Sequence, residues 1–158
     1  MGEPILTPSK IPTVLVETDG PIINRPLIVA DRTLHITTVS MGNPHAVTFV
    51  EDVRNYPVEV VGPLVEHHPA FPRRTNTEFI QVVSDSEIIF RVWERGAGAT
   101  LACGTGACAA VVACMLNGKT GRSVLVHLPG GDLDILWSET DNHVYMTGPA
   151  TEVFTGEI

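Results

Sequence analysis

The segment 106–117, GACAAVVACMLN, contains no charged residue and places small or apolar side chains on every side of a helix. A helix that is apolar all round has to be buried on all sides. Segments with the alternating pattern of β-strands lie both before and after it. The sequence therefore predicts an α+β domain in which strands wrap around one buried central helix, rather than a doubly wound parallel sheet.

Alternation of apolar and polar residues marks the expected strands, and turn residues separate them. Gly42 and Pro44 lie in one such turn, SMGNPH, and Gly130–Gly131 and Asp141–Asn142 mark two hairpins. A short helical turn is expected at 61–66. We expect strands at 13–17, 34–39, 46–50, 77–83, 87–94, 124–128, 132–137, 143–146 and 152–154.

The first 26 residues are rich in proline and turn residues, with no internal repeat or low-complexity segment here or later. We expect residues 1–26 to form an extended lead-in that resembles a join between domains. A chain of 158 residues is long enough for one domain with its own core. Residues 27–158 are therefore expected to form a single domain.

Charge and cysteine content narrow the class of protein. A net charge of −8 argues against nucleic acid and anionic membranes as partners, but is compatible with a small anionic substrate. No apolar run is long enough to span a bilayer, and the N-terminus lacks the features of a signal peptide. Three cysteines without a CxxC pair favour a reducing, cytoplasmic location. His67 and His68 have no further ligand at metal spacing, so no metal site is expected.

The densest chemical signal is WERGAGATLACGTGACAA, residues 93–110. Cys103 stands just before Gly104, Thr105 and Gly106, where the buried helix is expected to begin. Free backbone N–H groups and the helix dipole at this place favour a carboxylate or a thiolate. We therefore expect a lowered pKa for Cys103 and the highest reactivity among the three thiols.

Cysteines without a partner are more often buried small hydrophobes, and this alternative applies to Cys103 as well. Cys108 and Cys114 fit it better, since both lie inside the apolar segment and not at its beginning.

Several polar residues could serve the same site. Arg95 could clamp a carboxylate with two hydrogen bonds, and Glu94 could accept bonds from an ammonium group or influence a thiol. The alternative is a solvated pair at a strand end. His45 could tune the charge state of a cysteine. Asn43 and Asn76 have a simpler alternative role as turn and loop caps.

Together these segments resemble the diaminopimelate epimerases. The stretch ERGAG followed by ACGTGACAA is the most specific match. The matching pieces are spread over the chain as far as Phe154: MGEP, SMGNPH, GPLVEHHPAFPRRTN, ERGAGATLACGTGACAA, LPGGDLDILW and MTGPATEVF.

This resemblance implies inversion at the α-carbon of diaminopimelate without a cofactor, in lysine and cell-wall precursor synthesis. The family uses two cysteines, one from each of two similar domains, and Cys103 matches that of the second domain. By the same matching, His45 and Glu94 tune the cysteines, and Phe154 lies at a dimer contact. The remaining matches bind the substrate: Asn43, Asn76, Glu94, Arg95, Gly104 and Thr105.

Members of this family are roughly twice as long, and the motif with the first catalytic cysteine is absent here. We therefore expect the C-terminal half of an epimerase, which is inactive without its N-terminal domain and forms a homodimer. One alternative is a non-catalytic module that binds an amino acid or associates with itself. Another is a related proline racemase or phenazine-type isomerase.

Overall fold

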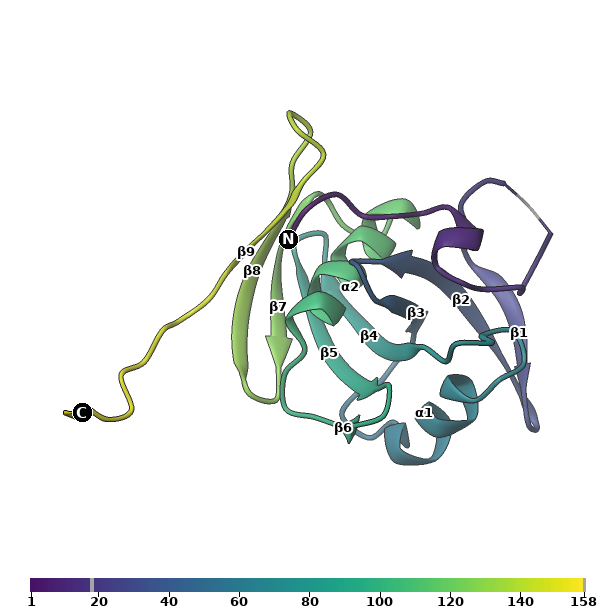
Figure 1. Ribbon diagram of the computed structural model, residues 1–158, viewed down its shortest axis with the longest axis horizontal. Helices are drawn as coiled ribbons and strands as arrows, with labels where there is room; N and C mark the ends of the chain where they lie inside the picture. Colours follow the sequence, from purple (N-terminus) through teal and green to yellow (C-terminus); the bar gives the residue numbers. More distant parts are fainter. Residues whose placement is uncertain (18, 158) are drawn as a thin grey trace.

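The computed structural model describes residues 1–17 and 19–157 (Figure 1). A 3-10 turn, η1 (Pro8–Lys10), precedes the sheet, and the helices are α1 (Val58–Glu66) and α2 (Gly104–Leu116). The strands are β1 (Arg25–Val29), β2 (Arg32–Ser40), β3 (Pro44–Phe49), β4 (Asn76–Ser84), β5 (Glu87–Glu94), β6 (Gly98–Ala99), β7 (Ser123–Leu128), β8 (Gly131–Trp137) and β9 (Val144–Thr147).

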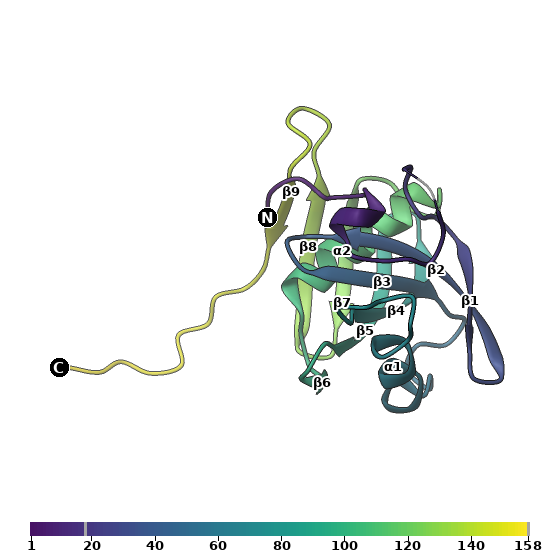
Figure 2. The ribbon, with the colours of Figure 1, turned by 45° about the vertical axis from the view of Figure 1, so that its right-hand side comes forward.

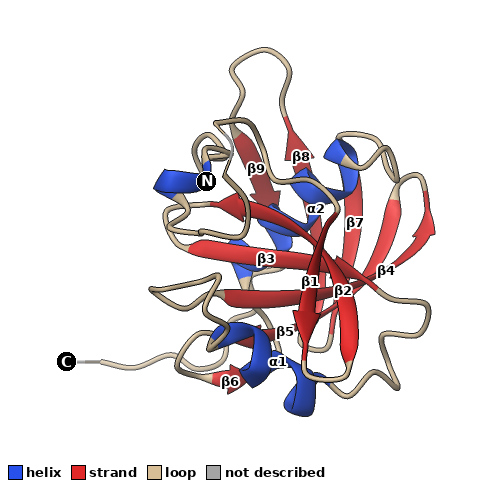
Figure 3. Cartoon of the chain, turned by 90° about the vertical axis from the view of Figure 1, so that its right-hand side faces the viewer, coloured by secondary structure: helices blue, strands red, loops and turns tan. Residues whose placement is uncertain are grey.

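The strands form one mixed sheet whose order, β1-β2-β3-β4-β5-β7-β8-β9, follows the chain, with β6 paired to β5. Most neighbours are antiparallel, but β3 pairs with β4, and β5 with β7, in parallel. A parallel pair needs a crossover connection, and α1 and α2 lie in these two connections. The sheet curves strongly, so its strands surround α2 (Figures 1 and 3).

Helix α2 is enclosed, as the sequence predicted. All side chains from Gly106 to Cys114 are buried, and the helix contacts strands on both sides of the fold, from β2 to β9. The helix begins at Gly104, two residues before the predicted start, and Cys103 is its N-cap. The C-terminal end of the helix lies within one residue of the prediction, whereas its first turn also includes Gly104 and Thr105.

Helix α1 lies on the opposite face of the sheet. Its inner side, with Val61 and Val65, packs in a second core cluster with Phe79 of β4, whereas its outer side exposes Val60. The next residue of β4, Ile80, faces the cluster around α2. Only the segment 61–66 was predicted to be helical; the structure extends this turn to a full amphipathic helix.

Two predicted strands are absent. Residues 13–17 are tied instead to the loop after α1, because the Val14 N–H and the Thr13 hydroxyl both donate to the carbonyl of Ala70. Residues 152–154 belong to an extended tail that leaves the body of the domain (Figure 2). Alternation shows that a segment could be a strand, but a strand also needs a neighbour, and neither segment has one.

The structure adds two strands that the pattern did not indicate. Strand β1 begins at Arg25, inside the predicted lead-in, and pairs with β2. Strand β6 is a two-residue strand beside the end of β5. The segment before β1 packs on the domain, since Ile11 and Ile22 are fully buried. Within the described residues, no helix has the length and hydropathy of a membrane span.

Candidate functional site

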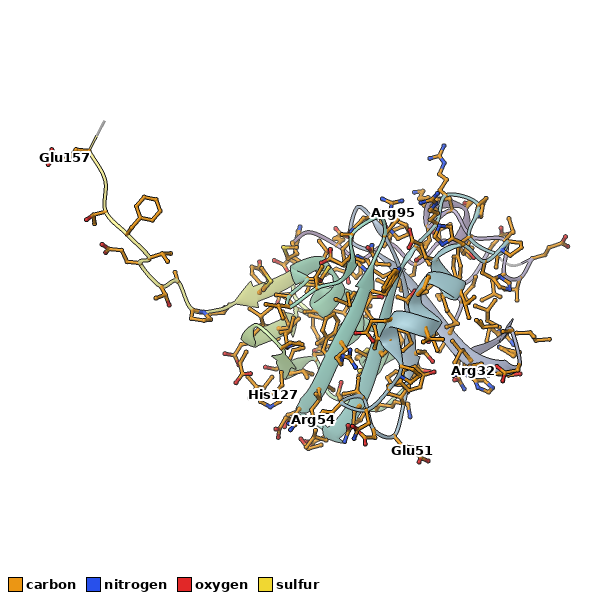
Figure 4. All side chains as sticks on the ribbon, turned by 90° about the horizontal axis from the view of Figure 1, so that it is seen from below. Arg32, Glu51, Arg54, Arg95, His127 and Glu157 are labelled. Carbon is orange, nitrogen blue, oxygen red and sulfur yellow. The ribbon has the colours of Figure 1, made fainter. Side chains whose placement is uncertain are left out.

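The predicted site residues gather at one edge of the sheet, where the N-terminus of α2 meets three strand ends. Strands β3 and β4 both begin at this edge, with His45 opposite Asn76 in their parallel register. Strand β5 runs antiparallel to β4 and therefore ends there, with Trp93 opposite Thr77. Figure 4 shows Arg95, which follows β5, at the opposite end of the domain from His127 of β7.

Cys103 lies at the N-terminus of α2 and is 7 % exposed, whereas Cys108 and Cys114 are fully buried. Its sulfur is 3.6 Å from the hydroxyl oxygen of Thr105. A Cβ atom on Gly106 would lie 3.1 Å from the Cys103 sulfur and also 3.1 Å from Oε1 of Glu78. Glycine at position 106 thus lets a thiol and a carboxylate approach the same point of the helix.

The expected lowering of the Cys103 pKa is wrong. Burial raises the pKa of this thiol to about 11, and the carboxylates of Glu78 and Glu94 add to the rise. Hydrogen bonds from the Thr105 hydroxyl and the Gly106 backbone N–H favour the thiolate, but they do not outweigh the loss of water. In this domain Cys103 is therefore a protonated thiol at neutral pH, suited to donate a proton.

His45 and Glu78 form a buried pair of titratable side chains near the Cys103 thiol. His45 Nδ1 lies 2.7 Å from Glu78 Oε1, and neither side chain is exposed. Burial raises the pKa of Glu78, while the neighbouring imidazole opposes the rise. Among the described residues, Oε2 of Glu78 has no hydrogen-bond partner. Sequence reasoning missed Glu78, although its two-residue spacing from Ile80 placed it on the inner face of β4.

A chain of hydrogen bonds links His45 to Cys103. His45 Nε2 lies 3.0 Å from the amide oxygen of Asn43, and the Asn43 amide nitrogen donates to the Thr105 hydroxyl at 3.2 Å. An amide oxygen only accepts, so His45 carries a hydrogen on Nε2 in this arrangement. The Thr105 hydroxyl accepts from Asn43 and can donate its own hydrogen to the Cys103 sulfur. The chain fixes the side chains around the thiol.

Asn76 joins two of the strand ends. It is buried, its amide oxygen accepts the Arg95 backbone N–H at 2.8 Å, and its amide nitrogen donates to the Pro44 carbonyl at 2.8 Å. The side chain therefore holds the segment after β5 against the beginning of β3. Both ends of the amide are engaged with backbone in this structure.

Glu94 is the last residue of β5, and Arg95 begins the turn to β6. The Thr100 hydroxyl donates to Glu94 at 2.5 Å, which orients the carboxylate. Arg95 is exposed, and its guanidinium donates to the carbonyl of Arg73 at 3.1 Å. An exposed guanidinium suits an anionic ligand such as a carboxylate.

Other predicted positions lie apart from this group. Phe154 is 85 % exposed in the C-terminal tail. His67 Nδ1 contacts the Pro63 carbonyl, and His68 Nε2 contacts that of Ile28. Within residues 1–17 and 19–157, no three side chains of His, Cys, Asp or Glu are arranged to hold a metal ion.

The arrangement can act on one side of a bound molecule. The first turn of α2, with Gly104 and Thr105, offers backbone N–H groups to an anion, and Arg95 adds a cation. Cys103 contributes a protonated thiol beside them. The other two thiols, Cys108 and Cys114, are fully buried inside α2.

Comparison with known proteins gives a consistent family. The family model described as diaminopimelate epimerase matches residues 37–153. The chain is 61 % identical over 158 residues to diaminopimelate epimerase 1 of Nostoc sp., and 60 % identical over 158 residues to the diaminopimelate epimerase of Picosynechococcus sp.. All of this chain aligns, but it covers only 57 % and 56 % of those proteins. The chain thus spans about half the length of the curated relatives it matches.

Solved structures show the same fold at low identity. A hydroxyproline epimerase from Agrobacterium vitis aligns with a TM-score of 0.57 and 14 % identity, covering 73 % of this chain and 40 % of that one. A probable proline racemase from Agrobacterium radiobacter aligns with a TM-score of 0.53 and 15 % identity, covering 78 % and 44 %. At this identity the likeness is one of fold, and it agrees with strands wrapped around a central helix.

Proposed function

Because this chain belongs to the diaminopimelate epimerase family, we propose that it is the C-terminal half of a cofactor-independent epimerase. Its reaction is the inversion of L,L-diaminopimelate to the meso form. One observation carries the proposal. Cys103 lies in the family's most specific motif, at the N-terminus of a buried helix, and a chain of hydrogen bonds through Thr105, Asn43 and His45 leads to its sulfur. This supports an acid/base cysteine over a structural one.

The chemistry explains why these groups are needed. An amino-acid α-proton is very weakly acidic, so the negative charge that develops during its removal has to be stabilised. Backbone N–H groups of Gly104 and Thr105 would grip the α-carboxylate at the helix N-terminus. Arg95 would bind a carboxylate and Glu94 an ammonium group, with Asn43 and Asn76 completing the substrate contacts.

Inversion requires a base on one face of the α-carbon and an acid on the other. Cys103 serves one face, and its protonated form suits the acid. Cys108 and Cys114 are fully buried inside α2, so neither is available for the opposite face. We therefore propose that the second cysteine belongs to the N-terminal domain present in the full-length relatives, and that this half does not invert diaminopimelate alone.

The test joins this chain to the N-terminal domain of a relative, such as that of Nostoc sp.. The joined protein should convert L,L-diaminopimelate to the meso form and incorporate deuterium from D₂O, whereas the isolated chain should not invert it. Cys103→Ala should abolish inversion by the joined protein. The matched control is Cys108→Ala, which removes a thiol from the interior of the same helix and should retain turnover. Inversion that survives Cys103→Ala would contradict the proposal.

We also propose that the protein forms a homodimer. Phe154 and Val153 are 85 % and 89 % exposed in the C-terminal tail, and exposed apolar side chains of this size favour association. Sedimentation at micromolar concentration should show a dimer that Phe154→Ala weakens. A monomer before any substitution would refute this part.

A further inference from the structure

The last residue of α1, Glu66, is a nearly buried carboxylate with only 3 % of its side chain exposed. Its Oε2 accepts the indole N–H of Trp93 at 2.7 Å. Its Oε1 accepts the backbone N–H of Gly96 at 3.1 Å and lies 3.6 Å from the Arg74 guanidinium. Both oxygens are therefore engaged, and two of the partners flank Glu94 and Arg95 in the chain.

The same helix fixes Trp93 by contact. A Cβ atom on Gly62 would lie 2.4 Å from Cβ and Cγ of Trp93, so any larger residue would push the helix and β5 apart. On the turn side, a Cβ atom on Gly98, which has a φ of +85°, would lie 3.5 Å from Cη2 of the same indole ring. The indole thus lies between α1 and the turn, with its N–H directed to Glu66.

Helix stability does not explain a glutamate at this position. A carboxylate at the C-terminal end of a helix interacts unfavourably with the helix dipole, and burial adds a cost of desolvation. Its hydrogen bonds go mainly to β5 and to the turn that follows. Asn76 holds this turn from the other side through the Arg95 N–H. Glu66 and Asn76 thus fix successive backbone amides from opposite faces of the sheet.

We propose that Glu66 is a positioning residue for substrate binding: from α1, on the face of the sheet away from Cys103, it holds the turn after β5 so that Glu94 and Arg95 keep the geometry that binds diaminopimelate. This inference rests on the proposed function for the identity of the ligand. That Glu66 fixes the turn after β5 does not depend on the proposed function and can be measured separately.

The test is Glu66→Gln, which keeps the size of the side chain. One end of the glutamine amide becomes a donor that faces the donor of Trp93 or Gly96, so one of the two bonds is lost. In this chain, the indole N–H resonance of Trp93 should shift, and exchange of the Gly96 amide with D₂O should accelerate roughly tenfold or more. In the joined two-domain protein, KM should rise about tenfold while kcat changes by less than about threefold.

Two further variants complete the test. Glu59→Gln removes a carboxylate from the exposed side of the same helix, where it pairs with Arg91, and should leave KM and Gly96 exchange unchanged. Trp93→Phe removes the indole donor but keeps an aromatic ring, and should raise KM less than Glu66→Gln does. It also serves as the second variant should Glu66→Gln fail to fold.

The outcomes separate the two proposals. Faster Gly96 exchange with an unchanged KM would overturn the positioning role, as would a fall in kcat at constant KM. Unchanged exchange in Glu66→Gln would overturn the hold on the turn. If the joined protein without substitutions fails to convert diaminopimelate, the proposed function falls, and the exchange measurement alone then decides whether Glu66 holds the turn.

Discussion

Among the residues that the structure describes, two glutamates are almost completely buried, on opposite faces of the same sheet, and their oxygens are paired in different ways. Glu66 receives hydrogen bonds from Trp93 and Gly96 on separate oxygens, with Arg74 nearby. Glu78 has one oxygen against His45, and within the described part of the chain its other oxygen has no partner. Burial raises the pKa of Glu78.

The difference separates two uses of a buried carboxylate. A carboxylate with donors on both oxygens fixes the groups that donate to it. A carboxylate with one unpaired oxygen holds a proton more readily, because the charged form lacks full compensation for lost water. Glu66 therefore anchors backbone, whereas Glu78 is suited to hold or share a proton beside His45 and Cys103.

The largest expected effect comes from a third buried carboxylate without any partner. Val112→Asp would place one in the centre of α2, where Val112 is fully buried. The free energy of unfolding should fall by at least about 4 kcal/mol, or the protein should fail to fold. Val60→Asp on the exposed side of α1 is the control and should change it by less than about 0.5 kcal/mol. Urea unfolding followed by circular dichroism measures both, and similar losses would contradict an enclosed α2.

The second effect removes the fully paired carboxylate. Glu66→Leu preserves bulk but leaves the Trp93 indole N–H and the Gly96 N–H without their acceptor. Unsatisfied buried donors should lower the free energy of unfolding by about 2–4 kcal/mol at pH 7. The same urea measurement tests this, and a loss below about 1 kcal/mol would show that water reaches these donors.

The third effect is a change in pH dependence. Because the folded pKa of Glu78 is raised, this group contributes stability at acid pH that is lost as the pH rises through the folded pKa. Glu78→Gln resembles the protonated acid and lacks that loss, so it should be close to the parent in stability at pH 4. It should gain about 1 kcal/mol relative to the parent by pH 8. A relative loss of stability with rising pH would show that Glu78 is better paired than its contacts indicate.

The smallest effect belongs to an exposed counterpart of the Glu78–His45 pair. His127 lies 2.8 Å from both Asp132 and Glu87, and these hydrogen bonds raise its pKa. The stabilisation is present below the ordinary histidine pKa and is lost as the pH rises through the folded pKa. Glu87→Gln should therefore cost about 0.5 kcal/mol or less at pH 6 and nothing measurable at pH 9. A loss as large as that of Glu66→Leu would remove the distinction between buried and exposed carboxylates.

The sequence predicted the parts of the fold that depend on local pattern. The absence of charge in α2 required enclosure, and the bounds of β5 agree with the prediction. Residues 13–17 and 152–154 have the same alternation but no neighbouring strand, and pattern alone does not reveal whether a neighbour exists. The two-residue error at the start of α2 has a similar cause, since glycines permit several conformations and the fold selects one.

The residues of the site likewise fall into those that the sequence predicted and those that depend on the whole fold. Cys103, Glu94 and Arg95 stand close together in a continuous motif, so their grouping was visible in the sequence. Glu66 and Glu78 were not identified, because each is a single charged residue whose partners lie 27 and 33 positions away in the chain. The lowered pKa expected for Cys103 failed for a related reason: the helix N-terminus is a local feature, whereas the burial that outweighs it comes from the whole fold.

The agreement between sheet order and chain order has a consequence for synthesis on the ribosome. Each strand from β2 to β5 can pair with a strand that has already emerged. The charge-free α2 follows β5, so it leaves the ribosome when strands β2 to β5 are available to receive its apolar surface. Strands β7, β8 and β9 then close over it. Because synthesis adds about 5–20 residues per second, the apolar surface of α2 stays uncovered for only seconds. Adding strands to the sheet in chain order would thus limit aggregation of the segment that carries Cys103.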